Sequence, residues 1–177
     1  MILETERLVL RKPQADDAEE LFALHRDPEA MQFVGGPRPD FQETVEVIEH
    51  WLGLWERNGV GHFAAERRED GAVVGRVGFV VWDTSLWEIR TRQDAGEHAQ
   101  PELGWALARE HWGHGYATEG AAAARDWFRG EFGDDRLISV IAPANVRSQR
   151  VAEKLGCVPR ETVVLPQHGP VVVWEYS

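Results

Sequence analysis

Residues 112–119 have the sequence Trp112-Gly113-His114-Gly115-Tyr116-Ala117-Thr118-Glu119 and lead directly into the alanine-rich run 121–128. Alanine favours a helix, and two glycines just before a helix predict a tight turn that uses positive φ. The first turn of a helix leaves backbone N–H groups without intrahelical partners and carries a partial positive charge. The stretch therefore predicts a binding site for a phosphate group, although an ordinary turn between a strand and a helix would show the same pattern.

A second segment, residues 145–157, has the pattern of one short helix with both ends marked. Asn145 is a favourable N-cap, and Gly156 occupies the position where helices commonly end in a left-handed conformation. Ser148 shares a helical face with the apolar residues that follow it at spacings of three, four and seven, so we expect it to point inward. A buried hydroxyl needs a hydrogen-bond partner, which is either a ligand or a carbonyl of the preceding helical turn.

Together these segments resemble the two signature motifs of the GNAT acetyltransferases, and specifically those of the RimJ/RimL-like branch. The family pattern Q/R-x-x-G-x-G/A falls on residues 112–117, with Trp112 in place of the usual Gln or Arg. The second family motif, Asn-x-x-Ser-x-x-Val-x-x-Lys-Leu-Gly-Phe, is matched over residues 145–156 and departs at Cys157, where an aromatic residue is usual. Residues 4–11 also resemble the opening strand of that branch, so the resemblance extends over almost the whole chain.

The resemblance implies an α+β, single-domain GNAT-like fold over residues 1–177. Its central sheet is expected to be mixed and mostly antiparallel, with about six to seven strands and about four flanking helices. Sequence patterns predict strands at 8–11, 62–67, 73–82, 102–107, 137–141, 158–165 and 171–176, and helices at 16–25, 42–57, after the glycine stretch, and from 145. Asp16 with Glu19 is expected to form a capping-box-like start of the first of these helices. We expect the sheet to splay at the cofactor site, between the fourth and fifth of these strands.

Two segments have no regular pattern. Residues 26–40 contain Gly35-Gly36-Pro37 and are expected to form a mobile edge of the substrate site. Residues 83–100 are polar and are expected to form a long loop or an irregular hairpin arm.

The 177 residues suffice for one domain that buries roughly 70% of its unfolded surface. We expect a cytoplasmic protein, because the sequence shows neither a long apolar run nor a secretory start. The single cysteine, Cys157, excludes an internal disulfide and fits a reducing compartment. The formal charge of −11 argues against nucleic acid as a partner and favours a cationic substrate, although excess carboxylate also simply keeps a protein soluble.

The resemblance implies an acetyl-CoA-dependent N-acetyltransferase that transfers acetyl directly to a primary amine in a ternary complex. The implied cofactor-binding residues are Leu107, Trp112, Gly113, His114, Gly115, Tyr116, Ala117, Thr118, Asn145 and Ser148. Backbone amides of the glycine stretch would hold the diphosphate, and the Leu107 amide would polarise the thioester carbonyl. Arg109, Arg147 and Arg150 are further candidates for the phosphates.

The reaction needs a proton acceptor and a later donor, because an amine with a pKa of about 10 is protonated at neutral pH. Ser148 is expected to donate a hydrogen bond to the departing thiolate, with Tyr116 as the rival. Glu102, on the strand beside the cofactor, is the expected base, directly or through water, with His98 as the second choice. Asn145 is expected to bond the pantetheine or a substrate amide, although its capping role alone would explain it.

Several alternatives stay open at this point. The acceptor is either a protein N-terminal amine, as for the namesakes of the branch, or a small molecule such as a polyamine, an aminoglycoside or an amino acid. A hypothesis from a different class is a catalytically degenerate CoA-binding sensor or interaction module. No metal and no membrane contact are predicted, since no cluster of ligand residues has the spacing of a metal site. The family resemblance allows a homodimer.

Overall fold

The computed structural model describes residues 1–133, 136–166 and 168–177, and one mixed sheet runs through them. The strand order is β1-β2-β3-β4-β6-β7-β9-β8, with β5 paired to β4 as a ninth strand. The strands are β1 (Ile2–Glu4), β2 (Leu8–Arg11), β3 (His62–Arg67), β4 (Val73–Asp83), β5 (Glu88–Ile89), β6 (Ala99–Leu107), β7 (Ile138–Ile141), β8 (Cys157–Leu165) and β9 (Gly169–Tyr176).

The sheet opens between β6 and β7. These two strands run parallel and are in register only at Glu102 and Ile138, whereas the other neighbouring strands pair in antiparallel fashion. From Glu102 to its end at Leu107, β6 pairs with β4 along one edge, and no described strand pairs with its other edge. The α+β class and the splay between the fourth and fifth predicted strands are therefore confirmed.

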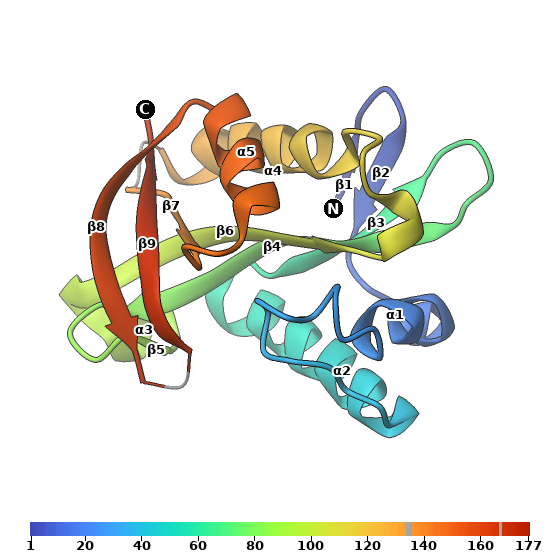
Figure 1. Ribbon diagram of the computed structural model, residues 1–177, viewed down its shortest axis with the longest axis horizontal. Coiled ribbons are helices and arrows are strands. Elements are labelled where there is room, and N and C mark those ends of the chain that lie inside the picture. Colours follow the sequence, from blue (N-terminus) through green and yellow to red (C-terminus); the bar gives the residue numbers. More distant parts are fainter. Residues whose placement is uncertain (134–135, 167) are drawn as a thin grey trace.

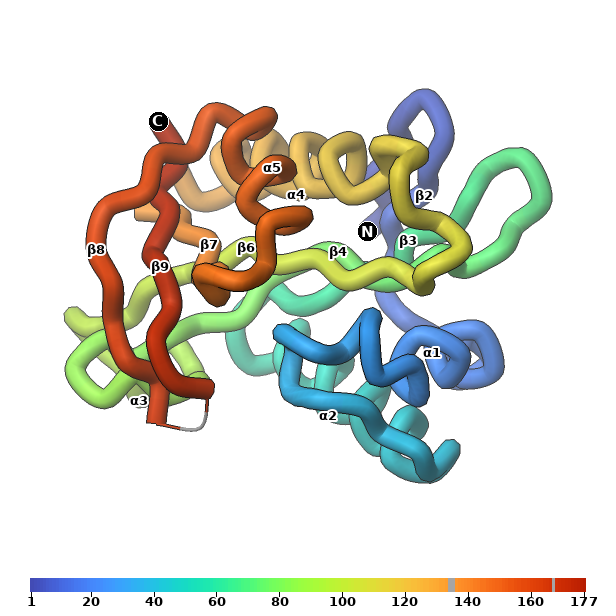
Figure 2. The backbone as a smooth tube through the Cα atoms, in the orientation of Figure 1, coloured from blue at the N-terminus to red at the C-terminus, as the bar shows by residue number. Residues whose placement is uncertain are grey.

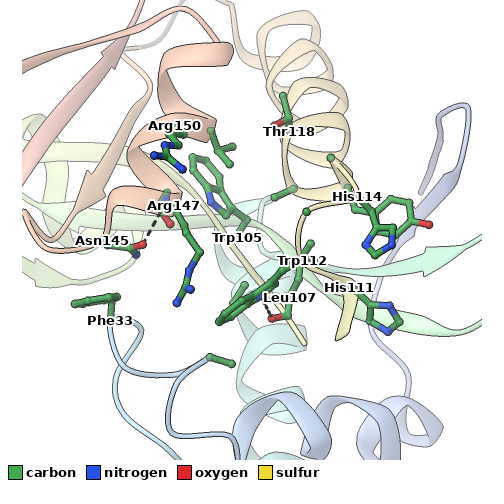
Figure 3. A pocket seen from close by; sticks show the side chains of 18 of the residues that line it. Phe33, Trp105, Leu107, His111, Trp112, His114, Thr118, Asn145, Arg147 and Arg150 are labelled. Atoms are coloured by element: carbon green, nitrogen blue, oxygen red, sulfur yellow. Dashed lines mark hydrogen bonds between the residues drawn. The ribbon is translucent and has the colours of Figure 1, made fainter. Parts of the chain in front are cut away.

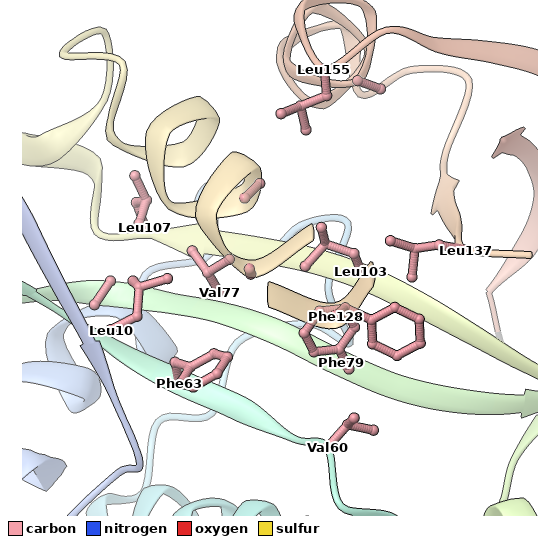
Figure 4. Packing of buried hydrophobic residues seen from close by; sticks show 14 of the residues in the cluster. Leu10, Val60, Phe63, Val77, Phe79, Leu103, Leu107, Phe128, Leu137 and Leu155 are labelled. Atoms are coloured by element: carbon pink, nitrogen blue, oxygen red, sulfur yellow. The ribbon is translucent and has the colours of Figure 1, made fainter. Parts of the chain in front are cut away.

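Helices cover both faces of the sheet. In the described part of the chain they are α1 (Ala18–His25), α2 (Phe41–Asn58), α3 (Arg92–Ala95), α4 (Tyr116–Phe132) and α5 (Val146–Lys154), with 3-10 turns η1 (Ala15–Asp17), η2 (Gly96–His98) and η3 (Arg109–His111). Figure 1 shows α4 and α5 on one face and α1 and α2 on the other. The largest packed cluster lies under α4, where Phe128 stacks on Phe79 with ring centroids 4.9 Å apart (Figure 4).

The start of α1 differs from the predicted one. The sequence suggests Asp16 and Glu19 as a capping pair, but the reciprocal bonds join Gln14 to Asp17, whose Oδ2 accepts from the Gln14 amide at 2.8 Å. Arg11 donates two further hydrogen bonds to the Asp17 carboxylate, at 2.8 and 2.7 Å. This tertiary ion pair fixes the cap, so helical spacing alone places it incorrectly.

The strand count was also predicted too low. The short edge strand β1 is exposed or half-buried along its length and shows no alternation of apolar and polar residues. Residues 83–100, expected to be a loop or hairpin arm, contain β5, α3 and η2, and the Thr91 hydroxyl caps α3 by accepting from the Asp94 amide at 3.1 Å. Elements this short depend on neighbouring contacts more than on local pattern.

Residues 26–40 remain irregular, as predicted. Figure 2 shows this segment between α1 and α2, below the opening of the sheet. The helices of the described residues include none that is both long enough and apolar enough to cross a membrane.

Candidate active site

Two cavities meet at the opening of the sheet. The first, of about 530 Å³, lies between the start of α4, one side of α5 and the end of β6. The second, of about 360 Å³, is lined by residues of β4, β6, β7 and the irregular segment 32–38. Both cavities are lined by Phe33, Val34, Trp105, Asn145 and Ser148. A molecule in one cavity can therefore reach a molecule in the other beside the N-terminus of α5.

The glycine stretch borders the first cavity with unused amide groups. Gly113 and Gly115 adopt φ values of +80° and +84°, and α4 begins at Tyr116. Among the described residues, none accepts a hydrogen bond from the amides of residues 113–118. Since successive free N–H groups at a helix start bind anions, this arrangement suits a phosphate or diphosphate.

The end of β6 offers backbone groups to the same cavity. The amide of Ala108 donates to the carbonyl of Val74 at 3.0 Å, and hydrogen-bonded positions alternate along an antiparallel pair. Trp105 and Leu107 therefore direct their amides and carbonyls away from β4, toward the opening of the sheet. The Leu107 carbonyl accepts from Trp112 Nε1 at 2.8 Å, and the Leu107 amide remains available to a ligand in the cavity.

Cationic side chains of α5 face this cavity. Arg147, Arg150 and Lys154 line it, and the Arg147 guanidinium lies 3.9 Å from the ring centroid of Trp112 (Figure 3). Trp112 thus packs against the Arg147 guanidinium and is hydrogen-bonded to the end of β6. The family motif has Gln or Arg at this position. Arg109, a predicted phosphate contact, does not line the cavity and forms ion pairs with Asp27 and Glu29 instead.

Asn145 and Ser148 lie where the cavities join. The Asn145 side-chain oxygen accepts from the Ser148 amide at 3.2 Å, so the predicted N-cap is present. The Ser148 hydroxyl is half-buried and forms no hydrogen bond with any described residue. The alternative in which it bonds to a carbonyl of the preceding turn is not observed, and the hydroxyl is free to donate to a ligand.

Tyr116, the rival donor, is buried in the core beside the glycine stretch. Its ring stacks on the His114 ring, with centroids 5.6 Å apart, and the Arg7 guanidinium lies 4.9 Å from its centroid. These ring contacts and the burial of the side chain point to a packing role.

The predicted base, Glu102, lines the second cavity. Its Oε2 accepts from Trp82 Nε1 and its Oε1 accepts from the Val140 amide at 3.2 Å. Burial raises the pKa of Glu102, although both hydrogen bonds oppose the shift. A raised pKa makes a carboxylate a better proton acceptor near neutral pH. His98, the second choice, is exposed in η2 and lines neither cavity.

Sequence reasoning missed several residues of the second cavity, chiefly Arg76 and His62. The available signal was the lone arginine in the otherwise apolar strand Val73–Trp82. The expected contribution of residues 26–40 to a site is visible in the structure, because residues 32–36 and Arg38 line this cavity. Of the segment 83–100, Ile89 lines the second cavity.

Comparisons with known proteins agree with this geometry. Residues 7–158 match the family model described as the acetyltransferase (GNAT) domain. The chain is also similar to YkkB of Bacillus subtilis (strain 168), with 32% identity over 178 residues that cover 98% of this chain and 94% of YkkB.

Solved structures share the fold. An acetyltransferase from Agrobacterium tumefaciens str. C58 superposes with a TM-score of 0.79 and 29% identity, covering 100% of this chain and 94% of that one. RimL, described as a ribosomal L7/L12 alpha-N-protein acetyltransferase in complex with coenzyme A, has a TM-score of 0.76 over 99% of this chain and 97% of its own. At 14% identity, the likeness to RimL shows the fold alone.

Proposed function

This chain belongs to the acetyltransferase (GNAT) family, and we propose that it transfers an acetyl group from acetyl-CoA directly to a primary amine held in the second cavity. The family makes it an acetyl-CoA-dependent acyltransferase. The observation that supports direct transfer is the meeting of the two cavities at Asn145 and Ser148. Cofactor and acceptor can then reach each other within one ternary complex, without a covalent acetyl-enzyme.

The residues of the first cavity fit coenzyme A. The free amides of residues 113–118 are suited to the diphosphate, and Arg147, Arg150 and Lys154 add positive charge for the phosphates. When bound, acetyl-CoA supplies the acetyl group as a thioester. The Leu107 amide, directed into the opening of the sheet, is placed to stabilise negative charge on the thioester oxygen.

Glu102, Ser148 and Asn145 have separate roles in the proposed reaction. Glu102, directly or through water, takes a proton from the ammonium form of the acceptor, which frees the nitrogen lone pair. The N–C bond to the acetyl carbon then forms, the C–S bond breaks, and the second proton that the nitrogen loses passes to the departing sulfur, which leaves as the thiol of CoA. The Ser148 hydroxyl donates a hydrogen bond to the departing sulfur, and Asn145 keeps the start of α5 in place while offering its amide nitrogen to a ligand.

The same proposal covers the extent of the domain, the branch of the family and the kind of acceptor. We assign residues 1–177 to a single acetyltransferase domain of the RimJ/RimL-like branch, which acts on a small amine or a peptide N-terminus and not on nucleic acid. Support comes from the matches to the motifs at residues 112–119 and 145–156 and from the volume of the second cavity, about 360 Å³. A cytoplasmic location and a homodimer stay predictions.

Thiol release separates this proposal from a CoA-binding sensor. Acetyl-CoA is incubated with the protein and a panel of amines or a cell lysate, free thiol is followed with time, and acetylated products are identified by mass spectrometry. The proposal predicts amine-dependent thiol release matched by an acetylated amine. A chain that binds CoA but releases thiol with none of the amines would be a sensor or interaction module.

A further inference from the structure

The second cavity differs in charge from the molecule as a whole. The chain carries a formal charge of −11, yet the cavity is lined by two arginines, Arg38 and Arg76, against one carboxylate, Glu102. His62, also in the lining, is neutral because burial lowers its pKa far below the ordinary value. With two arginines against one carboxylate, the lining of the second cavity is net positive.

Arg76 is held in place by neutral groups. Its Nη1 lies 3.2 Å from His62 Nδ1, and its guanidinium lies 5.6 Å from the ring centroid of Trp51. Burial lowers the pKa of Arg76 to about 10, so the side chain is still charged at neutral pH. Because His62 is neutral, its Nδ1 can accept a hydrogen bond from the guanidinium, which orients the arginine without neutralising its charge.

Neither arginine of the cavity forms an ion pair with a carboxylate of the described chain. Other arginines do form such pairs, including Arg7, Arg11, Arg67, Arg90, Arg109 and Arg160. A guanidinium in a partly buried cavity loses hydration free energy, and without an ion-pair partner it gains no direct electrostatic attraction that offsets the loss. Its planar fork of donors matches a carboxylate, which can bind through two parallel hydrogen bonds.

The Arg76 guanidinium lies close to Glu102, the expected base. Gly78 pairs with Gly104 across β4 and β6, and Arg76 and Glu102 stand on the same face on either side of that pair. A Cβ at Gly104 would lie 3.9 Å from Arg76 Nη1 and 3.9 Å from Glu102 Oε1. The two groups are therefore at most twice that distance apart, with the empty position above Gly104 between them.

We infer that the acceptor is an amine with a carboxylate close to the reacting nitrogen, as in an α-amino acid, and that Arg76, with Arg38, binds this carboxylate beside Glu102. The inference rests on the proposed function. An amine and a carboxylate on one carbon can reach Glu102 and Arg76 at the same time. A polyamine or an aminoglycoside would bring further positive charge against the two arginines, while the negative charge of the distant surface is screened beyond about 10 Å.

Matched acceptors test this inference. Each amino acid is offered as the free acid, as its amide and as the decarboxylated amine, for example L-phenylalanine, L-phenylalaninamide and phenethylamine, and kcat/KM is compared per unprotonated amine. We expect the preferred acid to exceed its amide by about tenfold or more. Equal or faster turnover of the amides or the decarboxylated amines would overturn the inference.

Variants connect that preference to the two arginines. R76Q and R38Q should lower kcat/KM for the acid far more than for the amide, which removes the preference for the acid, and R76K should retain part of that preference. R57Q serves as the control, because Arg57 lines neither cavity and should leave the preference unchanged. An unchanged dissociation constant for CoA shows that each variant is folded, and an acid preference that survives in both R76Q and R38Q would contradict the inference.

A binding measurement keeps this inference separate from the proposed function. Calorimetry with CoA present measures the affinity for each acid and amide without requiring turnover. If no amine is acetylated, the proposed function fails, but tighter binding of an acid to the wild type than to R76Q would still support the carboxylate site. If amides are acetylated and acids bind no better than amides, the proposed function holds and the carboxylate site is wrong.

Discussion

The carboxylate of Glu119 binds Arg7 through both the backbone and the side chain of that residue. Glu119 Oε1 accepts from the Arg7 amide at 2.8 Å, and Oε2 accepts from Arg7 Nε at 2.7 Å. Arg7 Nη1 also donates to the His114 carbonyl at 2.8 Å. The turn between β1 and β2 therefore holds the glycine stretch from outside.

This contact predicts a long-range effect on cofactor affinity. Arg7 and Glu119 do not line the first cavity, yet R7A should weaken CoA binding by about tenfold, about 1.4 kcal/mol, because the His114 carbonyl and its neighbouring amides lose their support. Calorimetric dissociation constants measure this effect. R68A is the matched control, since Arg68 donates to the Thr5 carbonyl in the same turn and has no bond to the glycine stretch. Equal affinities for R7A and wild type would show that the amides are positioned without Arg7.

The same carboxylate predicts a dependence of stability on pH. Burial raises the pKa of Glu119, but hydrogen bonds from Thr5 and Arg7 outweigh it, so the net pKa lies below the ordinary value of 4.5. The stabilising contribution is therefore complete above that value and is lost as the pH falls through the lowered pKa. The Tm difference between wild type and E119Q should be largest near neutral pH and should shrink in acid. A difference that stays constant from neutral pH to pH of about 3 would contradict this assignment.

Replacement of Ser148 tests the sulfur contact. S148A should lower kcat by about 10²-fold while leaving the KM for acetyl-CoA nearly unchanged, because the hydroxyl matters when charge develops on sulfur. Steady-state kinetics at saturating acetyl-CoA give both constants. S85A should behave like wild type, since Ser85 bonds to Asp83 and lines neither cavity. An S148A enzyme with full kcat would show that the departing sulfur does not need the hydrogen bond from Ser148.

The pH profile tests the base. Because burial raises the pKa of Glu102, kcat/KM of the wild type should fall as the pH drops through a value above the ordinary 4.5. E102Q should be slow and should lack this acid limb, since its amide does not titrate. A variant that keeps both the rate and the limb would exclude Glu102, directly or through water, as the proton acceptor.

The sequence predicts the parts of this site that depend on neighbours along the chain. The cap at Asn145 and the positive φ of Gly113, Gly115 and Gly156 are local requirements, and each appears where the pattern predicts it. All ten residues predicted to bind the cofactor line the first cavity. A glycine turn and a helix face need little tertiary information, which is why a motif predicts their geometry, while the binding of the cofactor by these residues stays a prediction.

The remaining features depend on contacts between distant segments. The capping pair of α1 is fixed by Arg11 on β2, and the charge of the second cavity results from Arg38 and Arg76, which are far apart in the sequence. A formal net charge is a sum over the whole surface and says nothing about which charges face one cavity. The expectation of a cationic substrate rested on that sum, whereas the carboxylate site rests on the local arrangement.

The affinities of wild type, G115V and G71V for CoA and for pantetheine show most directly whether the amides of residues 113–118 bind the diphosphate. Gly71 is the matched control, because it has a similar φ of +77° but lies in the β3–β4 turn, away from both cavities. If amides 113–118 bind the diphosphate, wild type and G71V will bind CoA far more tightly than pantetheine, and G115V will lose that difference while its affinity for pantetheine stays the same. A G115V protein that binds CoA as tightly as wild type would contradict the account.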